Sequence, residues 1–174
     1  MRRSHLFAVA FGTAILASSH LSAHVTLEAR EAPIDSYYKA AFGVGHGCEG
    51  SPTVRVRVRI PDGVTGVKPQ PKAGWEVATV KTKLEKPISG DHGATITEVV
   101  SEVVWSGGKL LDAHFDQFLM QVKLPKAAPG TVLYFPVVQD CEKGVNRWIE
   151  IPGAGKKLGD YKQPAAALTL IAKP

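Results

Sequence analysis

The segment TVRVRVRIP, residues 53–61, alternates apolar and charged residues with a period of two. Three valines and Ile60 occupy one set of positions, and three arginines occupy the other. Because successive side chains of a strand point to opposite faces, this pattern predicts a strand with one buried face and one solvated face. The sequence PDG follows directly and is typical of a turn.

The rest of the chain consists of similar short runs separated by segments rich in Gly and Pro. Further strands are expected at residues 25–28, 37–44, 75–84, 95–105, 115–124, 132–138, 145–151 and 166–172. No stretch shows a helical period over ten residues. The sequence therefore predicts one all-β domain, an antiparallel β-sandwich, with immunoglobulin-like and cupredoxin-like strand orders both compatible with the pattern.

The first 23 residues resemble an export signal. Arg2 and Arg3 precede an apolar stretch at residues 6–17, and small residues follow it. This stretch is shorter than the roughly 20 residues that a membrane-spanning helix needs. We therefore expect a signal peptide at residues 1–23 and a mature domain at residues 24–174 that does not span a membrane. Cleavage after Ala23 or after Ser19 would leave a histidine as the first residue.

Composition argues against several functional classes. The formal net charge is +5, but two of these charges belong to the leader and the other basic residues are scattered among few aromatics. This arrangement does not favour nucleic-acid binding. The chain also lacks the G-x-S-x-G and H-E-x-x-H patterns and a phosphate-binding loop. We therefore do not expect an enzyme.

The two cysteines, Cys48 and Cys141, both lie in the expected mature part. In an oxidising compartment the default expectation is one disulfide, and the alternative is a pair of thiolates on a soft metal. A disulfide would bring the HGCE segment close to the DCEKGVNRWIEIP segment. Glu49 and Trp148 could then converge in space.

His24 would be the first mature residue after cleavage at Ala23. It would then offer two nitrogens to one metal ion, the α-amino group and the imidazole Nδ1. The amine has an ordinary pKa near 8, so losing its proton costs little at neutral pH. Nitrogen ligands of this kind suit copper(II), which also leads the affinity order of divalent ions. The leader blocks this site, because the nitrogen is then part of a peptide bond.

The sequence resembles the YcnI-like copper-binding domain of exported bacterial proteins. The matching segments are AHVTLEAREAP, VRVRVRIPDGV, PKAGWEV, GGKLLDAHFDQFLMQVKLP and CEKGVNRWIEIPG, which run in order over nearly the whole mature chain. The resemblance implies an immunoglobulin-like or cupredoxin-like sandwich that binds copper(II) through a single-histidine brace. It implies His24 as the terminal ligand, Glu49 as the carboxylate ligand and Trp148 as the neighbouring tryptophan.

The two cysteines depart from the plainest pattern of that family and leave alternatives open. His46 could replace or supplement Glu49, and a cysteine could ligate copper(I). The expected function is a periplasmic or extracellular carrier, metallochaperone or buffer in copper homeostasis that exchanges copper(II) with other copper-trafficking proteins. The alternatives are a copper-dependent oxidative enzyme and a metal-free sandwich that mediates protein contacts.

Overall fold

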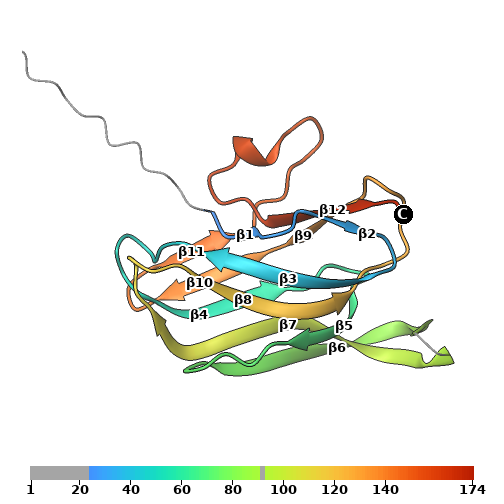
Figure 1. Ribbon diagram of the computed structural model, residues 1–174, viewed down its shortest axis with the longest axis horizontal. Coiled ribbons are helices and arrows are strands. Elements are labelled where there is room, and N and C mark those ends of the chain that lie inside the picture. Colours follow the sequence, from blue (N-terminus) through green and yellow to red (C-terminus); the bar gives the residue numbers. More distant parts are fainter. Residues whose placement is uncertain (1–23, 91–92) are drawn as a thin grey trace, which may run out of the picture.

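The structure is a computed structural model that describes residues 24–90 and 93–174 (Figure 1). The expected signal peptide, residues 1–23, lies outside the described residues. Apart from the short 3-10 helix η2 (Leu158–Asp160), the elements of the described part are strands. They are β1 (Thr26–Leu27), β2 (Glu31–Pro33), β3 (Tyr37–Val44), β4 (Thr53–Arg59), β5 (Thr65–Pro69), β6 (Glu76–Ser89), β7 (Thr95–Leu110), β8 (Asp116–Lys123), β9 (Val132–Phe135), β10 (Val137–Cys141), β11 (Val145–Trp148) and β12 (Ala166–Ile171).

The strands form three sheets. Their orders are β1-β3-β8-β5, β11-β10-β4-β7-β6 and β2-β12-β9. Strand pairing is antiparallel throughout these sheets except between β12 and β2, which run parallel. The predicted all-β sandwich is therefore confirmed, with one parallel pair that the sequence did not indicate. In the described part of the chain, no helix could cross a bilayer.

Aromatic side chains join the three sheets into one core. Trp105 of β7 meets Phe118 of β8 edge to face, with ring centroids 5.6 Å apart. Phe42 of β3 meets Phe135 of β9 at the same separation. All four side chains are completely buried. Such edge-to-face pairs add to the free energy gained by removing large apolar surfaces from water.

The segment of alternating apolar and charged residues, 53–61, forms β4 as predicted, but the alternation of buried and exposed side chains is broken at its first residues. Val56, Val58 and Ile60 are buried. A register shift separates Thr53 from Arg55 in the pairing with β7. As a result Thr53 is completely buried, although strict alternation would have placed it on the solvated face. An irregularity of this kind redirects side chains locally.

The expected single strand at residues 132–138 is in fact two strands, and this part of the prediction is wrong. β9 pairs with β12, whereas β10 pairs with β4 and β11. Pro136 separates them. Proline has no backbone N–H to donate to a neighbouring strand, so it interrupts the ladder. Its carbonyl still accepts a hydrogen bond from the Arg59 nitrogen at 2.9 Å.

Two strands were not predicted, and the hairpin of β6 and β7 is longer than expected. β2 and β5 are short, lie at the edges of their sheets and each contain a proline, which is tolerated at edges. β6 and β7 extend to Ser89 and Leu110. The end of this hairpin, where Ser89 pairs with Thr95, projects beyond the other strands (Figure 1).

Candidate metal centre

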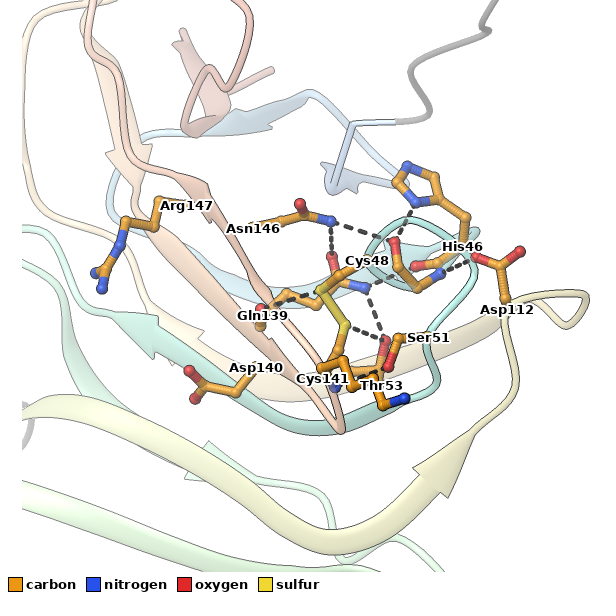
Figure 2. The surroundings of a disulfide bond; sticks show 12 residues. His46, Cys48, Ser51, Thr53, Asp112, Gln139, Asp140, Cys141, Asn146 and Arg147 are labelled. Atoms are coloured by element: carbon orange, nitrogen blue, oxygen red, sulfur yellow. Dashed lines mark hydrogen bonds between the residues drawn. A yellow bond between two sulfur atoms is a disulfide. The ribbon is translucent and has the colours of Figure 1, made fainter.

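A disulfide fixes the loop that carries the candidate ligands. Cys48 and Cys141 are bonded across 93 residues of chain, which confirms the predicted pairing. The bond attaches the segment after β3 to the end of β10 (Figure 2). With both sulfurs paired, neither cysteine offers a thiolate to a metal in this state.

The ligand loop turns tightly after Cys48. The backbones of Cys48 and Ser51 exchange two hydrogen bonds of 2.9 and 3.0 Å. Glu49 and Gly50 lie between them at φ values of 51° and 83°. Two consecutive residues with positive φ are typical of the tight turns that reverse a hairpin. The turn leaves the Glu49 side chain exposed to solvent.

A buried glutamine connects the loop to β11. Gln139 of β10 is 1% exposed, and its side-chain nitrogen donates to the His46 carbonyl at 2.6 Å and to the Thr53 hydroxyl at 2.7 Å. Its side-chain oxygen accepts from Trp148 Nε1 at 3.1 Å and from Asn146 Nδ2 at 3.3 Å. Both donor hydrogens and both acceptor positions of the amide are therefore in use. The sequence analysis did not single out this residue, although a glutamine directly after the apolar run VLYFPVV was a signal.

Two imidazoles lie beside the indole of Trp148. The indole is 2% exposed and lies at the end of β11. The His24 ring is 5.5 Å from it between centroids, at an interplanar angle of 52°. The His46 ring is 6.1 Å from the same indole, at 77°. The structure thus places both candidate histidines beside the tryptophan that the sequence singled out.

The His46 ring has one satisfied nitrogen and one unsatisfied nitrogen. Nδ1 contacts the carbonyl oxygen of Gly47, which can only accept a hydrogen bond, so Nδ1 must donate (Figure 2). In a neutral imidazole Nε2 then carries the free lone pair. Nε2 is buried and has no hydrogen-bond partner in the described structure. Since buried polar atoms are nearly always satisfied, this nitrogen needs an explanation.

Gly47 holds the ring in place. Its nitrogen donates to Asp112 Oδ1 at 2.8 Å, and its carbonyl also accepts from Asn146 Nδ2 at 3.2 Å. A Cβ at this position would lie 1.9 Å from the Ser51 carbonyl oxygen. Only glycine fits here, because the backbone passes too close for any side chain. The backbone that accepts from His46 is therefore fixed on both sides.

Glu49 is not part of this arrangement in the described structure. It forms no hydrogen bond, ion pair or ring contact with any residue of the described ranges. Nor do any three His, Cys, Asp or Glu side chains among the described residues form a ready metal cluster. A site at Trp148 would therefore combine the two imidazoles with the α-amino group that cleavage before His24 releases. The unsatisfied Nε2 of His46 fits that requirement.

His24 is accessible from outside. It is half-buried and lines a pocket of about 340 Å³ together with Arg30, Leu158, Pro164 and Thr169. This pocket lies beside β1 and the segment that contains η2. A ligand held at His24 would therefore be open to exchange with solvent or a partner.

Comparisons with known proteins agree with this architecture. The sequence profile described as a domain of unknown function (DUF1775) matches residues 24–170. The chain belongs to this family. The match of the DUF1775 domain begins at His24 and includes every residue of the candidate centre.

One solved structure shows the fold of this DUF1775 chain. It is an uncharacterized protein from Nocardia farcinica whose crystal structure is described as immunoglobulin-like. The two structures superpose with a TM-score of 0.63 at 23% identity, over 85% of this chain and 98% of that one. The likeness supports the immunoglobulin-like alternative of the predicted sandwich. No curated protein matches the chain.

Proposed function

We propose that this chain is an exported copper(II)-binding protein that carries or buffers copper, as its resemblance to the YcnI-like copper-binding domain implies. The observation that carries the proposal is the position of His24. Its imidazole lies 5.5 Å from the buried Trp148, at the start of the sandwich. The histidine that is expected to become the first residue therefore packs beside the buried indole of Trp148.

The donor chemistry favours copper(II). Cleavage before His24 would supply an amine next to an imidazole on the same residue, and both are nitrogen ligands that suit a cupric ion. Trp148 has no strong ligand lone pair, and its indole N–H is already donated to Gln139. Its role is to pack against the ligand rings and to shield one side of the ion from water.

The location of the centre favours transfer over catalysis. His24 is half-buried and lines a pocket, so a partner can approach this terminal ligand. A site with few ligands at an accessible chain end permits exchange one ligand at a time. The partners would be other copper-trafficking proteins. The leader and the disulfide both support a periplasmic or extracellular location.

The decisive experiment compares two forms of the mature protein. One begins at His24, as checked by mass spectrometry, and the other carries one extra glycine before it. We expect the first form to bind one copper(II) per chain. At a free copper concentration about 100 times the Kd, it should gain about 2.7 kcal/mol in free energy of unfolding. The extended form should lose this gain, because its first nitrogen is no longer attached to His24.

His114→Ala is the matched control, because His114 is an exposed histidine outside the centre. It should bind copper as the parent does. Equal affinity of the extended form would rule out the terminal nitrogen as a ligand. No binding by the processed form would rule out the proposed function itself.

A further inference from the structure

We propose that Nε2 of His46, and not the carboxylate of Glu49, is the side-chain ligand that joins His24 on the copper ion. This inference rests on the proposed copper function and specifies its ligand set. It makes the centre one of two imidazoles and one amine. Copper binding alone does not require these three ligands, since a carboxylate could take the place of the second imidazole.

The first support is the free nitrogen itself. Nε2 of His46 is buried and has no hydrogen-bond partner in the described structure. Burying a polar atom without a partner lowers the stability of the folded state. A metal ion bound there would satisfy the lone pair and offset that penalty. The unsatisfied atom is therefore explained if it is a ligand.

The second support is the orientation of the ring. Metal-binding histidines usually donate their other ring nitrogen to a carbonyl or carboxylate, which fixes both the tautomer and the direction of the lone pair. His46 Nδ1 has this contact with the Gly47 carbonyl. Gly47 is in turn held by Asp112 and Asn146 (Figure 2). The ring is thus oriented before any ion arrives.

The third support is the connection between the ligand-bearing segments. The His46 and His24 rings lie beside the same indole, that of Trp148. Gln139 binds the Trp148 nitrogen and the His46 carbonyl with one side chain. One buried amide therefore sets the position of His46 relative to the tryptophan on which His24 packs. A binding centre needs this kind of preorganisation.

Glu49 lacks each of these features. Its side chain is exposed, and the described residues give it no hydrogen bond that would orient it. Its backbone lies in the left-handed region at φ 51°, as the turn between Cys48 and Ser51 requires. A free carboxylate on a turn would lose side-chain freedom on binding copper, whereas His46 would lose little.

A ligand set without a carboxylate also has a consequence for charge. The amine and the two imidazoles are neutral donors, so the bound ion keeps its full positive charge. A glutamate ligand would cancel part of it. The bound ion would therefore attract an external anionic ligand, such as chloride or a carboxylate.

The test uses the mature protein with His24 first and one equivalent of copper(II). Three variants are compared with the parent: His46→Gln, Glu49→Gln and the control His114→Gln. Electron paramagnetic resonance counts the coordinated nitrogens, and titration gives the Kd. We expect His46→Gln to lose one imidazole coupling and to bind copper at least about tenfold more weakly. Glu49→Gln and His114→Gln should match the parent in both measurements.

A second measurement needs no substitution. Substoichiometric copper(II) broadens the nuclear magnetic resonance signals of groups close to the ion. In the parent we expect the ring signals of His24 and His46 to disappear first, while the side-chain signals of Glu49 remain. This readout still applies if His46→Gln does not fold.

The outcomes separate the two proposals. If the parent binds copper and Glu49→Gln, but not His46→Gln, weakens it, the ligand assignment is overturned and the copper function stands. If the His46 ring signals persist at saturating copper, the assignment is equally wrong. If the processed parent does not bind copper, the proposed function fails before the ligand question arises.

Discussion

Trp148 donates its indole N–H to the side-chain oxygen of Gln139 at 3.1 Å, and both residues are buried almost completely. The two side chains come from adjacent strands, β11 and β10. The hydrogen bond satisfies a nitrogen that would otherwise be buried without a partner. It also fixes the orientation of the indole beside which the His24 and His46 rings lie.

We expect Gln139→Met to lower the free energy of unfolding by about 2–4 kcal/mol. The methionine fills a similar volume but leaves Trp148 Nε1 and the His46 carbonyl without the partner they have now. Urea denaturation measures the change. Gln121→Met is the control, because Gln121 is exposed and its replacement should shift stability by less than about 0.5 kcal/mol. Equal effects of the two substitutions would contradict the role of the buried amide.

The disulfide is expected to contribute about 2–5 kcal/mol to stability, since it closes a long loop in the unfolded chain. Replacing both Cys48 and Cys141 by serine should lower the free energy of unfolding by this amount. Denaturation of the parent with and without a dithiol reductant gives the same quantity independently. The reductant should leave the double variant unchanged. A reductant effect on that variant would show that the parent's loss has another origin.

Stability should fall at high pH because of Tyr38. Burial, with a smaller effect of the Glu28 charge, raises the pKa of Tyr38 to about 12. Its hydroxyl donates to the Ala29 carbonyl. The unfolded chain releases this proton near pH 10, but the folded chain keeps it until about pH 12. The contribution is therefore complete below pH 10 and is lost as the pH rises to about 12.

Tyr38→Phe tests this directly. The variant should lack the part of the stability decline between pH 10 and 12 that the parent shows, as followed by urea denaturation at several pH values. Tyr161→Phe is the control and should keep the decline, because it leaves Tyr38 in place. Identical pH profiles for the parent and Tyr38→Phe would refute the assignment.

Gly108 is required by the packing of Trp75. A Cβ at position 108 would lie 2.2 Å from Cε2 of Trp75, and this indole meets Phe118 edge to face at 4.9 Å. We expect Gly108→Ala to displace the indole and to lower the free energy of unfolding by about 1–3 kcal/mol. Gly153→Ala is the control, because no atom lies within 4 Å of a Cβ there. Thermal melting compares the two, and similar midpoints would contradict the close approach.

Much of the fold could be predicted because the apolar period of a half-buried strand is visible in the sequence. The alternation of residues 53–61 and the strand Tyr37–Val44 are examples. The break at Pro136 was missed because both flanking runs are apolar, so composition alone does not show that they join different sheets. The burial of Thr53 was missed because a register shift against β7 has no signal in a single strand.

The candidate site was predicted in part. The sequence indicated the disulfide, and it singled out His24, His46 and Trp148. The structure places both imidazoles beside the Trp148 indole. Gln139 was missed because the role of a buried amide depends on its partners, and here one lies on the neighbouring strand at residue 148 and another lies far away in the chain at residue 46. The resemblance favoured Glu49 over His46 as the side-chain ligand. Their different burial was not visible in the sequence, because it depends on the turn between Cys48 and Ser51.

Pro136 alone separates Phe135 from Val137, two completely buried residues whose strands belong to different sheets. A connection of one residue is too short to allow the two sheets to slide past each other. Such a movement would pull Phe135 or Val137 out of the apolar interior. Heat or denaturant should therefore disrupt both sheets in a single concerted transition. A metal ion at Trp148 would then bind and dissociate without a rearrangement of the sheets. Only the chain end at His24 would have to move.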